Sequence, residues 1–167
     1  AKLNPDSIIG IDIAAQMLDV GRKKLLEQHL DQLITLQVGD SEALPFTDNS
    51  FDAITCAYGV RNFEHLEAGL KEMYRVMRPG GKLAILEFSH PKNFPVKQGY
   101  QFYFKYILPT LGKLVSKHST AYTYLPESVM AFPEGLRFCD ILAGCGFKQP
   151  EARPLSFGIT TLYIAGK

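Results

Sequence analysis

The chain has 167 residues, a length typical of a single domain. Hydrophobic residues make up 46% of it and charged residues 21%, a composition that supports a buried core and argues against disorder. The formal net charge of +1 argues against a general nucleic-acid-binding protein. No apolar run approaches the ~20 residues of a membrane-spanning helix and no signal peptide opens the sequence, so we expect a cytoplasmic protein.

Strand and helix patterns alternate along the first half of the chain. The apolar run 7–12 predicts a strand ending in Asp12, and leucines at helical spacing predict a helix to about residue 29. Strands are then predicted at 33–38, 51–58 and 82–88, with a helix at 64–77 before the Pro79-Gly80-Gly81 turn. This alternation is typical of a parallel sheet. Because the apolar runs lack clean alternation, we expect strands covered on both faces.

A basic, aromatic segment follows Phe88. No acidic residue occurs between Phe88 and Pro126, and the lysines of the segment are Lys92, Lys97, Lys105, Lys113 and Lys117. Five aromatic residues crowd into a predicted helix at 100–106, which Pro109 should break or kink. Because aromatics on all sides of a helix need burial, we favour a lid-like insertion at about 89–126. A pair of ordinary packed helices with a solvated lysine face remains the alternative.

The rest of the chain predicts a helix and two closing strands. Pro133 suits the first turn of the helix, and Leu136, Cys139 and Ala143 would form its apolar stripe. Strands are predicted at 147–155 and 159–165. The three cysteines lack the spacing of a metal site, so we expect buried or incidental thiols and no metal.

Ligand-type residues end three successive strands. Asp12 ends the first, Asp40 follows the second, and Ala57 and Tyr58 end the third. In nucleotide-binding units an acid at the end of the second strand binds the ribose hydroxyls, ~20 residues after a glycine-rich loop. Counting back from Asp12 places that loop before residue 1. We therefore expect the chain to lack the first strand and its loop, or Asp12 to be only a strand-end acid.

These features together resemble the S-adenosylmethionine-dependent methyltransferases, and more narrowly the UbiE-type ubiquinone/menaquinone biosynthesis C-methyltransferases. The resemblance covers essentially the whole chain. It is carried by Gly39-Asp40-Ser41-Glu42-Ala43-Leu44-Pro45-Phe46, Tyr58-Gly59-Val60-Arg61-Asn62-Phe63, Arg78-Pro79-Gly80-Gly81, Leu86-Glu87-Phe88-Ser89 and Tyr124-Leu125-Pro126-Glu127-Ser128. It implies an α/β, Rossmann-like sheet with helices on both faces and a C-terminal antiparallel hairpin, in one truncated methyltransferase domain over residues 1–167.

The resemblance also implies S-adenosylmethionine as cofactor and assigns its binding residues. Asp12 would take the ribose hydroxyls, and Asp40 and Ser41 would hold the adenine. Ala57 stands where this family often has a serine, so its contact would come from the backbone. Met17 could pack on the cofactor, although we favour a place in the core. As it stands, the chain is expected to bind cofactor poorly or not at all.

The implied reaction is methyl transfer to a ring carbon of a prenylated quinol. A positive charge beside a ring hydroxyl stabilises the quinolate that makes the carbon nucleophilic. Arg61 is our candidate for this charge, because arginine stays protonated in proteins. Asn62 is our candidate for orienting the ring or a water. The alternative is that Arg61 caps the next helix or pairs with Glu64. The candidate proton acceptors are His90, His118, Tyr122 and Tyr124, and Glu87 is a further acid near the substrate.

The partners follow from the same resemblance. We expect a prenylated quinol, with the aromatic segment lining a channel for its tail and the lysines touching anionic lipid at the inner face of the membrane. We expect no nucleic acid. Other acceptors for the methyl group, a nicotinamide-dependent dehydrogenase and a non-catalytic interaction module remain alternatives, and both the quinone and the oligomeric state, including a homo-oligomer, are left open.

Overall fold

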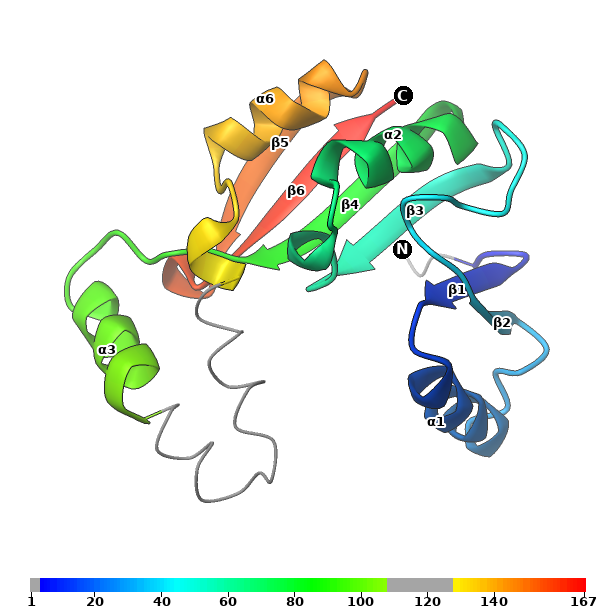
Figure 1. Cartoon of the computed structure of the whole chain (residues 1–167), viewed down its shortest axis with the longest axis horizontal. Coiled ribbons are helices and arrows are strands. Elements are labelled where there is room, and N and C mark those ends of the chain that lie inside the picture. Colours follow the sequence, from blue (N-terminus) through cyan, green and yellow to red (C-terminus); the bar gives the residue numbers. More distant parts are fainter. Residues whose placement is uncertain (1–3, 108–127) are drawn as a thin grey trace.

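The computed structural model describes residues 4–107 and 128–167, and its elements alternate as the sequence predicts (Figure 1). The elements in chain order are β1 (Ile8–Asp12), α1 (Ala15–Glu27), β2 (Ile34–Val38), β3 (Phe51–Ala57), the 3₁₀ turn η1 (Val60–Asn62), α2 (Leu66–Val76), β4 (Met77–Phe88), α3 (Val96–Phe102), the π-helical turn η2 (Tyr103–Ile107), α6 (Leu136–Gly144), β5 (Lys148–Leu155), the 3₁₀ turn η3 (Ser156–Gly158) and β6 (Thr160–Gly166). The expected α/β class is confirmed.

The strands form two sheets. β1 pairs with β2 in parallel, and β3 pairs with β4 in parallel within the sheet of order β3-β4-β6-β5. β6 runs antiparallel to both β4 and β5, which confirms the predicted C-terminal hairpin. Figure 1 shows α2 and α6 on one side of the strands and α1 on the other, as expected for helices on both faces.

β1 and β3 each have one edge that pairs with no other strand of the described structure. Among the described residues β1 pairs only with β2, and β3 only with β4. For a chain that lacks the first strand, we expected a gap between these two strands, a substitute strand from another chain, or direct pairing of the two. The first of these is found, because among the described residues β1 and β3 do not pair with each other and no strand pairs with both. β1 is less covered than we expected, because Ile8 and Ile9 are 40% and 39% exposed. The expectation that every strand is covered on both faces is therefore wrong for β1.

One core lies between the four-stranded sheet and the helices α2 and α6. Alternate residues of β4, including Leu83 and Ile85, point into it and are fully buried. They meet side chains from α2, α6 and β6, namely Leu70, Met73, Phe138, Leu142, Tyr163 and Ala165. Cys139 and Cys145 belong to this core, and burial raises the pKa of both thiols. The prediction of buried cysteines is confirmed for this pair.

The Pro-Gly-Gly turn lies inside β4 rather than after α2. α2 ends at Val76, and the extended Met77, which is fully buried, pairs with Phe51. The helix stops one residue before the predicted residue 77, because the backbone of Met77 is already extended (φ −78°, ψ 137°) and belongs to β4. The positive φ of Gly80 (84°) suits only glycine here, and a Cβ on Gly81 would lie 3.0 Å from the Asp52 carbonyl oxygen. The turn therefore lets β4 approach β3 closely.

The last helix also differs from the prediction. α6 begins at Leu136, so Pro133 precedes the helix instead of standing in its first turn. Gly135 has φ 67° and ψ −131°, a conformation open mainly to glycine, and this delays the start of the helix. Leu136 is 79% exposed, and the buried stripe consists of Phe138, Cys139 and Leu142. The larger Phe138 and Leu142, four residues apart, orient the helix in place of Leu136 and Ala143.

The aromatic segment is helical as far as Ile107, and Pro109 lies outside the described residues. Three of its aromatic side chains are exposed: Phe102, Tyr103 and Tyr106 are 57%, 41% and 53% exposed. Tyr100 is half-buried, and burial beside Glu134 raises its pKa to about 12. Part of this helix therefore offers aromatic surface to the outside of the described structure.

Candidate functional site

The predicted cofactor residues lie at the carboxyl ends of β1, β2 and β3. In Figure 1 the arrowheads of β1, β3 and β4 point the same way, so Asp12 and Ala57 share one end of the strands. Asp40 follows β2 after Gly39, whose backbone N–H donates to the Asp12 carbonyl at 3.2 Å. The structure thus brings Asp12 and Asp40 together at the edge of one sheet, as the sequence predicts.

Both carboxylates are exposed, and only one oxygen of each accepts a hydrogen bond within the described residues. Asp12 Oδ1 accepts from the Ala14 N–H at 2.8 Å, and Asp40 Oδ1 accepts from the Glu42 N–H at 2.8 Å. Within the described residues, the Oδ2 atoms of Asp12 and Asp40 make no hydrogen bond. A turn therefore fixes each carboxylate and leaves one oxygen to accept from a ligand hydroxyl or amino group. Ionised carboxylates only accept hydrogen bonds, so Asp12 and Asp40 suit the ribose hydroxyls and the adenine amino group of the expected cofactor.

The apolar residues after Asp12 strengthen the fit. Ile13, which follows β1 directly, is 75% exposed, and Met17 in the first turn of α1 is 65% exposed. The expectation that Met17 fills the core is wrong, because α1 turns Leu18 inward instead. Exposed aliphatic and thioether side chains beside two carboxylates are suited to stacking on a purine or packing on a thioether ligand.

The loop that carries Asp40 and Ser41 is held by charged side chains of α2 and its approach. Glu42 accepts from the His65 N–H at 2.9 Å and meets the His65 ring at 3.0 Å, and the His65 N–H lowers the pKa of Glu42. Arg75 donates to the carbonyls of Phe46 and Leu44, at 2.7 Å and 3.0 Å. These contacts tie the loop to α2, so that helix fixes its position.

Arg61 forms a buried ion pair with Glu87. Arg61 Nη1 lies 3.1 Å from Glu87 Oε2, and the side chains are 11% and 0% exposed. The Arg61 guanidinium also donates to the Tyr58 carbonyl and lies over the Phe88 ring, 5.4 Å from its centroid. The acidic partner of Arg61 is therefore Glu87 of β4, and not Glu64 as the alternative reading of the sequence expected.

The turn after β3 is locally strained. Tyr58 has φ 57°, the left-handed region that bulky residues rarely adopt, and its N–H donates to the Leu86 carbonyl at 2.8 Å. This conformation aims the Tyr58 carbonyl at the residues that follow, where Arg61 and Asn62 both donate to it. Asn62 Nδ2 reaches that oxygen at 3.5 Å. The strain therefore gathers the two predicted catalytic residues around one carbonyl.

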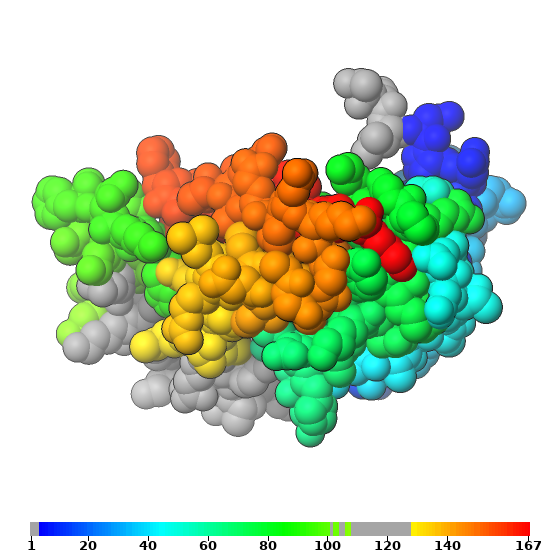
Figure 2. All heavy atoms as spheres, turned by 90° about the horizontal axis from the view of Figure 1, so that it is seen from above, coloured from blue at the N-terminus to red at the C-terminus, as the bar shows by residue number. Residues whose placement is uncertain are grey.

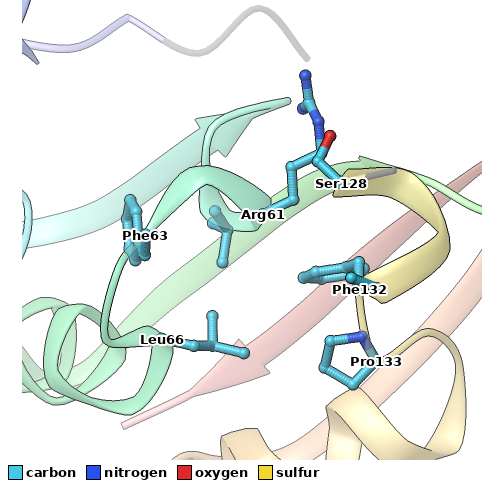
Figure 3. Close-up of a pocket in the computed structure, with 8 residues that line it drawn as sticks. Arg61, Phe63, Leu66, Ser128, Phe132 and Pro133 are labelled. Atoms are coloured by element: carbon cyan, nitrogen blue, oxygen red, sulfur yellow. The ribbon is translucent and has the colours of Figure 1, made fainter. Parts of the chain in front are cut away.

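A pocket of about 420 Å³ lies beside this turn. Its walls come from η1, the start of α2 and the segment before α6, and the lining residues are Val60, Arg61, Phe63, Leu66, Ser128, Ala131, Phe132 and Pro133. Figure 3 shows the Arg61 guanidinium and Ser128 at one end, and Leu66 and Pro133 at the other. The pocket therefore has a cationic end and an apolar end, an arrangement suited to a flat ring with one polar substituent.

The predicted proton acceptors are only partly placed. His90 Nδ1 lies 3.0 Å from Glu134 Oε2, and the His90 N–H donates to the same oxygen at 2.7 Å. His118, Tyr122 and Tyr124 lie outside the described residues. Burial raises the pKa of Cys56 at the end of β3, so this thiol is a poor nucleophile. In the described ranges no group of three His, Cys, Asp or Glu side chains is arranged to hold a metal ion.

Two features of the site escaped the sequence reasoning: one wall of the pocket and the partner of Arg61. No local sequence pattern predicts that Ser128 and Phe132 form one wall of the pocket, because those residues lie far along the chain from Arg61. The role of Glu87 could have been found, since Leu83, Ile85 and Glu87 alternate along one strand and so share its buried face. A charged residue on that face needs a partner, and a nearby arginine is the natural one.

The chain matches one known protein family along nearly its full length. The model of the ubiE/COQ5 methyltransferase family matches residues 3–167. The demethylmenaquinone methyltransferase of Bacteroides fragilis is 48% identical over 166 residues, which cover 99% of this chain and 68% of that protein. The demethylmenaquinone methyltransferase of Porphyromonas gingivalis is 42% identical over 160 residues, or 96% and 65% of the two chains. The chain thus spans about two thirds of the length of these relatives.

Solved structures support the fold. A S-adenosylmethionine-dependent methyltransferase from Aquifex aeolicus superposes with a TM-score of 0.66 at 16% identity, over 95% of this chain and 68% of that one. The carbon methyltransferase CurJ gives a TM-score of 0.67 at 17% identity, over 98% of this chain and 43% of that one. At these identities the likeness establishes the shared fold, which is the one the sequence predicted.

Proposed function

Because the chain belongs to the ubiE/COQ5 methyltransferase family, we propose that it transfers the methyl group of S-adenosylmethionine to a ring carbon of a prenylated quinol in menaquinone or ubiquinone biosynthesis. The names of the relatives from B. fragilis and P. gingivalis favour a demethylmenaquinol-type acceptor. Family membership makes the nicotinamide-dependent dehydrogenase alternative wrong. We further propose that residues 1–167 belong to one methyltransferase domain in which 89–126 is the lid-like segment.

The observation that carries the proposal is the pocket that joins Arg61 to an apolar floor. Leu66, Phe132 and Pro133 offer the surface that a fused aromatic ring and the first part of a prenyl chain need. The cationic end offers a partner for a ring hydroxyl. A polar small acceptor would leave the apolar floor without a complementary surface.

The chain's own residues have distinct tasks in this scheme. When bound, S-adenosylmethionine supplies an activated methyl group. Asp12 accepts from the ribose hydroxyls, Asp40 and Ser41 hold the adenine, and the Ala57 backbone borders the cofactor. Arg61 favours the ionised ring hydroxyl electrostatically, and Asn62 orients the ring or a water that takes the proton.

The reaction itself is tested with the full-length protein, S-adenosylmethionine carrying a labelled methyl group, and a short-chain demethylmenaquinol kept reduced. We expect label on a ring carbon of the quinone product. The oxidised quinone should not react, because it has no hydroxyl to ionise. Label on oxygen, or transfer only to an acceptor without a prenyl chain, would favour the alternative methyltransferase reading. Absence of binding of S-adenosylmethionine to the full-length protein would favour an interaction module.

Asp12→Ala should weaken S-adenosylmethionine binding by about 1.5–3 kcal/mol, because the ribose hydroxyls lose a charged acceptor. Calorimetry on the full-length protein measures this. Asp12→Asn keeps an acceptor for the Ala14 N–H and so isolates the charge from the turn. Asp6→Ala, an exposed acid before β1, is the matched control and should leave the affinity unchanged. Equal affinity in wild type and Asp12→Ala would make Asp12 only a strand-end acid.

We also propose that the protein binds anionic lipid at the inner face of the membrane, from the cytoplasm. The contact surface would be the end of the molecule formed by α3 and the tip of the β5–β6 hairpin. Phe94 is 80% exposed and Phe157 is 85% exposed. Their loops are neighbours, since Ser89 Oγ donates to the Gly158 carbonyl at 2.9 Å, and Figure 2 shows both at one end. Lys92 and Lys97 are exposed there too. Among residues 4–107 and 128–167, no helix is long and apolar enough to cross a bilayer.

The double variant Phe94→Ser/Phe157→Ser should reduce binding to vesicles of mixed anionic and zwitterionic lipid by about tenfold or more, because two apolar rings no longer enter the interface. Sedimentation with the vesicles measures the bound fraction. Leu26→Ser is the matched control, because Leu26 is 59% exposed on α1 at the other end of the molecule. Binding that survives the double variant, or that is equal on purely zwitterionic vesicles, would contradict the proposal.

A further inference from the structure

Glu87 is a charged side chain that the reaction scheme leaves without a task. It lies near the end of β4 and is fully buried, on the same strand face as Leu83 and Ile85. In every hydrogen bond that Glu87 makes within the described residues, its carboxylate is the acceptor. Oε2 accepts from Arg61 Nη1 at 3.1 Å and from the Phe88 N–H at 3.2 Å, and Oε1 accepts from the Arg61 N–H at 3.3 Å and from Nη1 at 3.4 Å.

Burying the Glu87 carboxylate costs desolvation free energy, and its contacts with Arg61 offset that cost. A buried ion pair often contributes little net stability, because desolvation of both charges offsets their attraction. Glu87 holds both the backbone and the side chain of Arg61, and within the described residues no other acidic side chain forms an ion pair with Arg61. The pair therefore fixes where the guanidinium lies more than it strengthens the fold.

One donor of the held guanidinium remains unused. Arg61 Nε–H is buried and has no acceptor among the described residues. Arg61 lines the pocket, and its guanidinium marks the cationic end. A buried N–H that lacks an acceptor is rare in native proteins and is explained when a ligand oxygen completes it.

We propose that Glu87 is a positioning residue for the acceptor site: it holds Arg61 by Nη1 and by the backbone, and so keeps the guanidinium at the cationic end of the pocket for the hydroxyl oxygen of the ring acceptor. This inference rests on the proposed function, because it uses the same pocket and the same arginine. Glu87 itself touches neither the ring nor the cofactor, and it acts only through Arg61.

Glu87→Gln in the full-length protein tests the proposal. The glutamine keeps the size of the side chain, but its amide group must face N–H donors where the carboxylate accepted from them. The head group then turns away and Arg61 loses its anchor. We expect kcat to fall about tenfold or more. The pH at which kcat is half-maximal should rise, because the ring hydroxyl ionises less readily, while the affinity for S-adenosylmethionine should stay unchanged.

The double variant Arg61→Met/Glu87→Gln separates positioning from folding. If Glu87 acts through Arg61, adding Glu87→Gln to Arg61→Met should change kcat less than about twofold. The double variant should also melt at a higher temperature than either single variant, since it leaves no unpaired buried charge. A kcat loss in Glu87→Gln with an unchanged pH profile would make Glu87 purely structural. A profile moved to lower pH would mean that Glu87 only weakens the arginine charge. Either result overturns the proposal.

A second measurement does not depend on the acceptor. The Arg61 Nε–H signal of the ¹⁵N-labelled protein should exchange slowly with water in the wild type and at least about tenfold faster in Glu87→Gln, because the anchored side chain is buried. Equal exchange rates would contradict the positioning role even if the protein methylates another acceptor. A wild type that lacks quinol methylation but shows the exchange difference would contradict only the proposed function.

Discussion

Arg61→Met in the full-length protein is expected to lower kcat about 10²–10³-fold, the usual cost of losing one electrostatic stabiliser. Methionine keeps much of the length and apolar bulk of arginine but removes the charge that favours the ionised ring hydroxyl. Higher pH should restore part of the activity, because a quinol without a neighbouring cation ionises at higher pH. Steady-state rates as a function of pH measure both effects, and calorimetry should give an unchanged affinity for S-adenosylmethionine.

The ion pair with Glu87 dictates the controls for this variant. Removing one partner of a buried pair can cost about 3–5 kcal/mol of stability, so each variant needs a thermal melt beside its kinetics. Arg61→Lys is the matched variant, because it keeps a positive charge and should retain more activity than Arg61→Met. Full activity in Arg61→Met, or a loss explained wholly by unfolding or by weaker cofactor binding, would give Arg61 a structural role only.

Phe138→Ala should destabilise the protein by about 3–5 kcal/mol, the range for truncating a fully buried phenylalanine. Phe138 is 0% exposed, and its ring centroid lies 4.9 Å from that of Phe132 and 4.7 Å from that of Tyr163. The alanine leaves a cavity between α6 and the sheet that these rings cannot fill. Denaturant unfolding at constant pH measures the change in the free energy of unfolding.

The same variant should also disturb the pocket. Phe132 lines it, and Tyr163 accepts from the Gly135 N–H at 2.8 Å, so Phe138 supports both ends of the wall before α6. Leu136→Ala is the matched control on the same helix, because Leu136 is 79% exposed and should change stability by less than about 0.5 kcal/mol. A cost below about 1 kcal/mol for Phe138→Ala would show that the surrounding side chains collapse into the space.

Local patterns in the sequence were sufficient for the elements and for the position of the strand-end acids. Apolar runs of strand length and a helical stripe in α2 predicted the order of β1 to β4, since burial of one face imposes its period on the sequence. The strand ends then placed Asp12 and Asp40 at one edge, where the structure has them. Arg61 was identifiable from its motif, but its role in catalysis remains a prediction.

Helix boundaries and the exposure of single side chains were less predictable. Pro133 and Leu136 looked like part of α6, but the backbone conformation of Gly135 and the bulk of Phe138 set where the helix starts and which face it buries. Met17 was expected to fill the core, but it is 65% exposed. Whether such a residue is covered depends on what packs against it, and that neighbour is distant in the chain.

The sequence by itself determined the α/β class, the C-terminal hairpin, the family and the strand-end acids, because each is encoded within a short stretch of residues. Only the tertiary structure revealed that Arg61 is anchored by Glu87 and shares a pocket with Phe132. These partners lie 26 and 71 positions away from Arg61 in the chain, and side-chain contacts across such separations depend on how the strands and helices pack. Periodicity indicates which face of an element is buried, but packing decides which charges and rings meet there.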